Sequence, residues 1–131
     1  MQYSSITTGY ALLAVGYIAK HKNEPTILSQ TISKAYGIPL NYLLRVMQQL
    51  VHANILRSKR GPRGGYSFAK PLNKITMLEI IEAIEGPMVG SLDLKELAPR
   101  EKFSNKADQT YTKALASIRA VLAKAKVSQM I

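Results

Sequence analysis

A short glycine-rich stretch, Ser58-Lys-Arg-Gly-Pro-Arg-Gly-Gly-Tyr66, carries the side chains with the clearest chemistry in this chain. Its cations Lys59, Arg60 and Arg63 can bind phosphates, and an arginine can also enter a narrow minor groove. Gly64 and Gly65 supply positive φ values at no steric cost, so we expect a mobile turn that adapts to an anionic surface. A solvated hairpin tip has the same composition, so the interpretation depends on the neighbouring elements.

A second group of polar side chains lies upstream at helical spacing. The spacing predicts a helix over 40–54, with Leu43, Met47 and Leu50 buried. The opposite face carries side chains that can recognise base edges, namely Asn41, Leu44, Arg45 and Gln48. Arginine can donate two hydrogen bonds to guanine, asparagine or glutamine can pair with adenine, and leucine can contact a thymine methyl group. Tyr42, at the helix start, is either a phosphate ligand or an interface aromatic.

The charge is strongly positive and unevenly distributed. The 131 residues have a formal net charge of +10 and a pI of about 9.9, which favours a polyanionic partner. Residues 25–78 contain no Asp or Glu, whereas the basic residues there are Lys34, Arg45, Arg57, Lys59, Arg60, Arg63, Lys70 and Lys74. A solvated protein surface usually mixes both signs, so this window predicts an anion-binding surface.

The elements that position these groups follow from periodicity and from start and stop signals. An amphipathic helix is expected over 7–20, with its apolar stripe formed by Ile6, Tyr10, Leu13, Ala14, Tyr17 and Ile18. A second helix is expected over 27–36, capped by Thr26, with Leu28, Ile32 and Ala35 inward and Gly37 as its stop. Together with the helix over 40–54, this spacing predicts a helix-turn-helix.

A hairpin and a fourth helix follow. Residues 55–58 and 66–69 are strand candidates joined by the glycine-rich turn. Thr76 and Glu79 form a capping-box pattern that opens a helix ending near Glu85, before Gly86-Pro87. The order of three helices, a hairpin and a helix predicts a mainly α fold with a small β-hairpin. This is a winged helix-turn-helix over 1–87, with the basic turn as its wing.

The C-terminal part predicts an assembly element. An irregular connecting segment is expected over 88–104 and a long helix over 105–131. Apolar residues recur along that helix with heptad spacing, at Tyr111, Leu115, Ile118, Leu122 and Ala125. A lone monomer would leave such a seam partly exposed, so we expect a C-terminal dimerisation helix and a homodimer.

Several classes of function lack the residues they need. The chain contains no Cys, which excludes disulfides, thiolate nucleophiles and cysteine-ligated metals. His21 and His52 are far apart with no acid cluster nearby, so we expect no metal, no cofactor and no enzymatic site. No apolar run reaches the roughly 18 residues of a membrane span, and no signal peptide is evident, so a cytoplasmic location without membrane contact is expected.

Five stretches resemble one bacterial family. They are Tyr10-Ala-Leu, the Gly37-Ile-Pro-Leu-Asn-Tyr-Leu segment, Ser58 to Tyr66, Ile75-Thr-Met-Leu-Glu-Ile-Ile and Ala83-Ile-Glu-Gly86. Together they are similar to the Rrf-type winged-helix regulators, the IscR, NsrR and CymR type, in register over about 3–87. The resemblance implies a dimeric transcription factor, usually a repressor. It places Asn41, Tyr42 and Arg45 at the start of a recognition helix and Arg60, Arg63, Gly64 and Gly65 in the wing.

The chain departs from the cluster-binding members, which carry three cysteines between the fourth and the last helix. We therefore expect a regulator that binds double-stranded DNA at an inverted repeat without an iron–sulfur cluster. Leu92, Leu94 and Leu97 lie in the connecting segment, which we expect to pack near the recognition helix of either subunit. They are a candidate site for a small-molecule effector or a regulatory protein partner. The alternative function is a DNA-independent interaction module that uses the basic face for an acidic protein.

Overall fold

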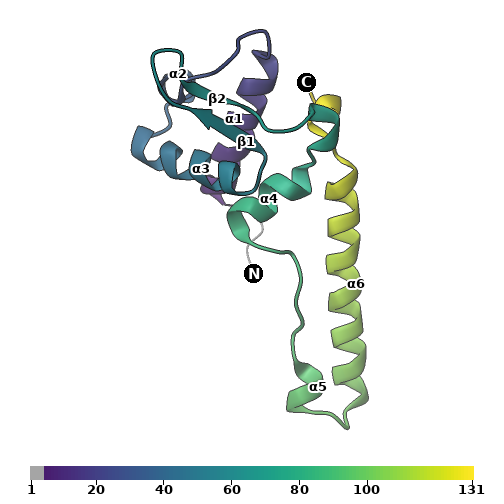
Figure 1. The fold of residues 1–131 in the computed structure, drawn as a ribbon. Helices are drawn as coiled ribbons and strands as arrows, with labels where there is room; N and C mark the ends of the chain where they lie inside the picture. Colours follow the sequence, from purple (N-terminus) through teal and green to yellow (C-terminus); the bar gives the residue numbers. More distant parts are fainter. Residues whose placement is uncertain (1–4) are drawn as a thin grey trace.

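The computed structural model describes residues 5–131 and has two parts, a helical domain and a long arm (Figure 1). The domain contains α1 (Ile6–Lys20), α2 (Ser29–Tyr36), α3 (Leu40–His52) and α4 (Met77–Glu85). A hairpin of β1 (Leu56–Lys59) and β2 (Gly65–Phe68) follows α3, and the 3₁₀ turn η1 (Leu72–Lys74) leads into α4. The arm consists of α5 (Leu94–Leu97) and α6 (Lys102–Lys124), and the 3₁₀ turn η2 (Val127–Gln129) follows it. The predicted winged helix-turn-helix with a long C-terminal helix is confirmed.

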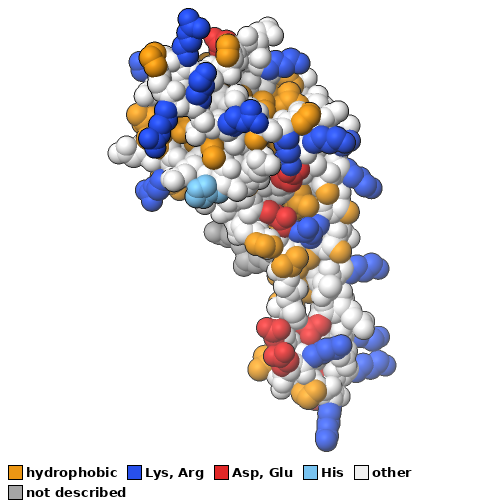
Figure 2. Space-filling view, in the orientation of Figure 1, with side chains coloured by type: hydrophobic (Ala, Val, Ile, Leu, Met, Phe, Trp, Pro, Cys, Tyr) orange, Lys and Arg blue, Asp and Glu red, His pale blue; other side chains and the backbone are white. Residues whose placement is uncertain are grey.

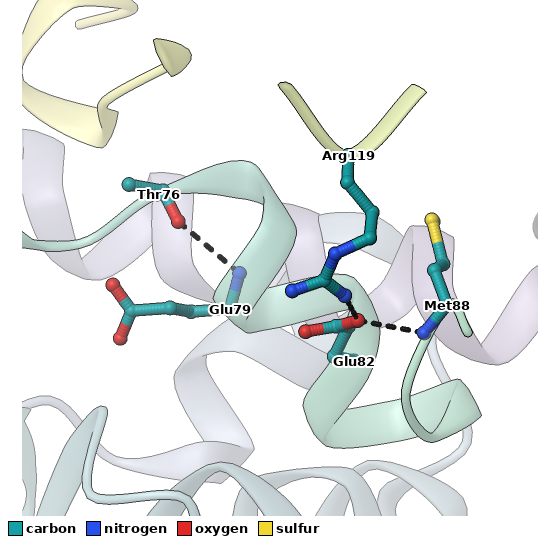
Figure 3. A network of polar contacts seen from close by, with 5 residues as sticks. All are labelled: Thr76, Glu79, Glu82, Met88 and Arg119. Atoms are coloured by element: carbon teal, nitrogen blue, oxygen red, sulfur yellow. Dashed lines mark hydrogen bonds and ion pairs between the residues drawn. The ribbon is translucent and has the colours of Figure 1, made fainter. Parts of the chain in front are cut away.

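The main core lies between the domain's helices and the hairpin. Its fully buried side chains come from every domain helix and from β1, and they include Val15, Ile32, Leu43, Leu56 and Ile80. Thr76 caps α4 as predicted, since its side chain accepts a hydrogen bond from the Glu79 N–H at 3.2 Å (Figure 3). The strands lie one residue later and one residue earlier than expected, respectively.

The inward face of α1 differs from the prediction. Its buried residues include Ala11, Ala14, Val15 and Ile18, whereas Leu13 is 44% exposed and Ile6 is 66% exposed. Apolar residues surround almost the whole helix, so periodicity alone does not select a face. The buried face of α1 is therefore the one that packs against α3 and α4.

The start of α2 also differs from the prediction. Leu28 is the N-cap residue and is 51% exposed, and Ala35 is exposed too, so of the three predicted inward residues only Ile32 is buried. The helix begins after Leu28 because Ile27 is in extended conformation, bridged to Tyr66 of β2. Thr26 therefore lies too far upstream to cap α2.

A second, smaller apolar cluster joins the domain to the arm. Leu78 and Ile81 of α4 pack with Met88, and Leu122 of α6 packs against them. Beside this cluster the Glu82 carboxylate accepts hydrogen bonds from the Arg119 guanidinium and from the Met88 N–H, the latter at 2.6 Å (Figure 3). One carboxylate thus connects α4, the connecting segment and α6.

The ends of the arm are also fixed by hydrogen bonds. At the far end the buried Asp108 carboxylate accepts from the backbone N–H groups of Leu94 and Lys95, at 3.3 and 2.9 Å, and so caps α5 from α6. At the near end the segment after α6 pairs with the entry to α4, through a bridge between Thr76 and Lys126. No helix in residues 5–131 is long and apolar enough to cross a membrane.

Candidate nucleic-acid interface

The turn between α2 and α3 determines which face of α3 reaches the surface. Gly37 has φ +66°, the left-handed conformation that ends α2, and the Ser33 hydroxyl donates to the Ile38 carbonyl at 2.5 Å. After this turn α3 packs Leu43 and Leu50 into the core, together with Val46 and Met47. The opposite side of α3 is therefore free of intrachain packing.

Four of the five predicted recognition residues lie on this free side. Asn41, Arg45 and Gln48 are exposed, and Leu44 is 39% exposed. A shallow depression of about 470 Å³ runs beside them, and its lining includes Arg45, Gln48, Gln49 and His52. The structure therefore presents a continuous row of hydrogen-bonding side chains along α3, which is the surface a major-groove helix needs.

Tyr42 is turned away from this row toward α1. Its ring makes an edge-to-face contact with Tyr10, with centroids 5.6 Å apart, and its hydroxyl is hydrogen-bonded to Thr7. The Arg45 guanidinium carbon lies 5.7 Å from the Tyr42 ring centroid, so the ring supports the arginine through a cation–π contact. Tyr42 thus fixes α3 on α1 and orients Arg45, while its contact with a phosphate stays a prediction. Nothing in the spacing indicated Thr7 as its partner.

The wing presents its cations at the edge of the domain. Lys59 ends β1 opposite Gly65 in the antiparallel register, and Arg57, Lys59, Arg60 and Arg63 are all exposed. None of the four forms an ion pair with another residue in 5–131. Their charge is therefore available to an external anion.

One side of the wing is held by the segment before α2. The Thr26 hydroxyl lies within hydrogen-bonding distance of two wing carbonyls, Arg63 O at 3.1 Å and Gly64 O at 3.0 Å. Ile27 and Tyr66 exchange two backbone hydrogen bonds of 2.8 Å, so this segment is paired with the hairpin through an isolated antiparallel bridge. The turn that the glycines predict to be mobile is thus held by hydrogen bonds on this side of the loop.

Gly64 and Gly65 make this anchoring possible. A Cβ on Gly64 would lie 2.5 Å from the Lys59 carbonyl oxygen, and a Cβ on Gly65 would lie 2.7 Å from the Ile27 carbonyl oxygen. Gly64 is buried, and its N–H donates to Gly61 O at 2.8 Å. Both glycines therefore have a structural role in the wing, and their predicted contact with DNA remains untested.

Replacing Gly65 by alanine should detach the wing from the segment before α2. Gly65 has φ +135° and its new Cβ would meet backbone, so we expect a loss of about 3 kcal/mol in the free energy of unfolding. Gly61→Ala is the matched control, because Gly61 has φ +105° with open space around its Cβ position. It should cost only about 1–2 kcal/mol. Denaturant unfolding and hydrogen exchange at the Ile27 amide measure the effect of each variant. Equal destabilisation by Gly65→Ala and Gly61→Ala would contradict a collision between the new Cβ and the Ile27 backbone.

The surface charge follows the division predicted from sequence. Figure 2 shows Lys and Arg side chains over both the upper domain and the arm, whereas the acidic side chains, apart from one at the top of the domain, gather near α4 and on the arm. Lys70, one of the basic residues in the acid-free window, is neutralised by an ion pair with Glu79. Burial raises the pKa of the Tyr66 phenol above its usual value, so this tyrosine adds no negative charge to the wing near neutral pH.

The predicted dimerisation seam on α6 is divided between two environments. Leu115 is 4% exposed and Leu122 packs against the α4 cluster, so both are used within the chain. The large apolar residues left exposed on α6 are Phe103 at 77%, Ile118 at 40% and Val121 at 69%. Two of the five predicted seam residues therefore pack within the chain, and dimerisation through this seam stays a prediction.

The connecting segment lies far from the recognition helix of its own chain. Figure 1 shows α5 at the outer end of the arm, away from α3. Leu92 is 44% and Leu97 79% exposed, whereas Leu94 is half-buried. Within one chain this segment does not lie beside the recognition helix, and its packing near the recognition helix of a second subunit stays a prediction.

These features define a winged helix-turn-helix protein with an exposed recognition-type helix, a basic wing and a projecting helical arm. The sequence profile of the Rrf2 family, described as an iron-dependent transcriptional regulator, matches residues 4–131. The chain therefore belongs to the Rrf2 family, as its motifs predicted.

Individual relatives agree with this assignment. The chain is 40% identical over 78 residues to a candidate HTH-type transcriptional regulator from Aquifex aeolicus, covering 60% of this chain and 54% of the relative. It is 38% identical over 79 residues to the HTH-type transcriptional regulator IscR of Cereibacter sphaeroides, covering 58% of this chain and 50% of the relative. The chain thus spans about half the length of these curated relatives.

The fold is shared with a solved structure over nearly the whole chain. CymR, the global cysteine regulator of B. subtilis, superimposes with a TM-score of 0.81 at 23% identity, covering 99% of this chain and 96% of CymR. The likeness includes the arm as well as the winged domain.

The iron dependence in the family's description does not fit the residues of this chain. No cysteine occurs in the sequence, so no thiolate is available to ligate iron or a cluster. Within residues 5–131, no three His, Asp or Glu side chains gather closely enough to hold a metal ion. We therefore derive no role for iron from these residues.

Proposed function

We propose that this protein is a sequence-specific DNA-binding transcriptional regulator that acts as a homodimer on an inverted-repeat operator, most simply as a repressor. The observation that carries the proposal is the placement of the exposed row on α3 beside wing cations that no carboxylate in 5–131 neutralises. A free row of base-reading side chains next to unpaired cations supplies both sequence readout and phosphate affinity. The family assignment supports the same function.

In this proposal α3 enters the major groove. Asn41, Arg45 and Gln48 read base edges by hydrogen bonds, and Leu44 meets a thymine methyl group. The wing then follows the backbone, where Lys59 contacts phosphate and Arg60 or Arg63 reaches into the adjacent minor groove. Because one side of the wing is anchored by Thr26, less conformational entropy is lost when it binds than a free loop would lose.

The proposed dimer brings two such surfaces together through the arms. The exposed apolar residues Phe103, Ile118 and Val121 lie on a helix that projects beyond the domain (Figure 1). Burying them against a second copy removes apolar surface from water, which favours association. A two-fold dimer presents its recognition helices to half-sites one or more helical turns apart, so the operator should be an inverted repeat.

Selecting bound fragments from random DNA and sequencing them tests the function directly. We expect enrichment of one inverted-repeat sequence. A pool that stays unenriched, with binding that ignores salt, would contradict the proposal and favour the DNA-independent module that binds an acidic protein.

Lys59→Ala is expected to weaken binding to all sequences alike. Removing one phosphate contact should lower the slope of log affinity against log salt concentration by about one. Titrating an operator fragment and a scrambled fragment at several salt concentrations measures this. Lys95→Ala, an exposed lysine on the arm, is the control for the lost charge and should leave the slope unchanged. A Lys59 effect confined to the operator would overturn the phosphate assignment.

A further inference from the structure

An apolar cavity of about 280 Å³ lies where α1, α4 and the turn η2 meet. Its floor is formed by Val15, Ile80 and Val127, which are 1%, 0% and 3% exposed. Met77 and Met130 lie at its rim, and Met130 is 51% exposed. The cavity therefore has a buried floor and an opening to solvent. The connecting segment, which the sequence suggested as an effector site, is mostly exposed.

Gly16 lines this cavity with no side chain of its own. It lies in the interior of α1, and a Cβ built on it would meet no heavy atom within 4 Å. Its φ is not positive, so neither backbone conformation nor close packing requires glycine here. Glycine within a helix costs about 0.5–1 kcal/mol relative to alanine. Gly16 thus makes α1 less stable than alanine would at the position where the helix lines the cavity.

The lining determines the class of ligand. Its side chains are aliphatic or thioether, with no charged or hydroxyl group among them. A ligand there gains stabilisation from apolar burial and from contacts between methionine sulfur and an aromatic ring. The volume is near the lower limit of ligand pockets, which fits a molecule of one or two rings. We propose that this cavity binds a small apolar or aromatic molecule that acts as an effector.

The position of the cavity connects such a ligand to the arm. Val127, on the cavity floor, donates its N–H to Ile75 O at 2.9 Å, and the Met77 N–H donates to Ala125 O at 2.9 Å. The chain leaving α6 is thus hydrogen-bonded to the entry of α4 at the cavity wall. A ligand that prefers one arrangement of this junction shifts the angle between arm and domain, and with it the spacing of the two recognition helices. This regulatory step rests on the proposed function.

Titration of the full chain with indole tests the cavity, with amide chemical shifts followed by NMR. We expect saturable shifts at Val15, Gly16 and Ile80, with a Kd below about 1 mM. Gly16→Leu fills the space and should weaken indole binding about tenfold or more while keeping or raising the melting temperature. Gly9→Leu is the matched control, since Gly9 is also in α1 with open space at its Cβ position, but does not line the cavity. It should change the affinity less than about twofold.

Three results would contradict the proposal that this cavity binds a ligand. The first is the absence of saturable shifts in the wild-type protein. The second is an equal effect of Gly16→Leu and Gly9→Leu on indole affinity. The third is indole binding that occurs only when Ile118 and Val121 are replaced by glutamate to prevent dimerisation. The last result would show that a second copy of the chain covers the cavity in the dimer. Operator binding by the same variants is measured separately. If the wild-type protein does not bind DNA, the proposed function is contradicted but the ligand cavity is not. If it binds DNA with the same affinity with and without indole, the effector role is refuted.

Discussion

Replacing Ile118 and Val121 together by glutamate is expected to give a folded monomer that binds its operator about 100-fold more weakly or worse. Both residues are exposed on α6, so two carboxylates there do not disturb the domain core. They would be buried between two copies, where unpaired charges strongly oppose association. A monomer then binds one half-site and loses the effective concentration that the second domain provides.

Sedimentation and operator titration measure this variant, and circular dichroism checks its fold. Ala116→Glu combined with Ala120→Glu is the matched control, because it adds the same two charges at exposed positions on another face of α6. The control should remain a dimer. Leu115→Glu does not serve as a test, since Leu115 is 4% exposed and a charge there would destabilise the chain itself. A stable dimer of the Ile118 and Val121 variant would place the contact elsewhere.

Arg45→Ala is expected to relax the sequence preference at one base pair in each half-site. A bidentate arginine–guanine pair contributes about 1–3 kcal/mol of discrimination, so the preference should fall roughly 5- to 150-fold at that position. The cation–π contact with Tyr42 limits the positions that the Arg45 guanidinium can reach. Binding to scrambled DNA should weaken much less, because few phosphate contacts are lost.

Repeating the selection from random DNA with the variant measures this effect position by position. Arg100→Ala is the matched control, as it removes an equal charge from an exposed site on the arm. It should leave the preference unchanged. An equal loss of operator and scrambled DNA binding with Arg45→Ala would show that Arg45 contacts phosphate instead of a base.

The local features of this chain were predictable because their physical causes act within a few residues. Thr76 caps α4 since its side chain reaches the N–H of a residue three positions on. Gly37 ends α2 because only a residue that tolerates positive φ suits that position. The order of helices and hairpin follows from such signals, and the family motifs overlap them.

Contacts between distant segments were not predictable in the same way. Thr26 has the residue type of a helix cap, yet its hydroxyl holds the wing, because the pairing of Ile27 with Tyr66 moves the start of α2. Tyr42 lies at the start of the recognition helix, yet its hydroxyl is bonded to Thr7 of α1. Each outcome depends on a partner more than 30 residues away in sequence.

The sequence by itself determined the type and order of the elements, the basic surface and the lack of thiolate ligands. Periodicity and composition are properties of the chain itself, so they can be recognised without knowledge of contacts between distant segments. The tertiary structure decided which faces are buried. Leu115 and Ile118 belong to one heptad seam, but Leu115 is buried and Ile118 is exposed, because one side of α6 packs against other parts of the chain, including α4 and α5. The cavity beside Gly16 likewise exists only in the folded chain, since its lining comes from α1, α4 and the residues that follow α6.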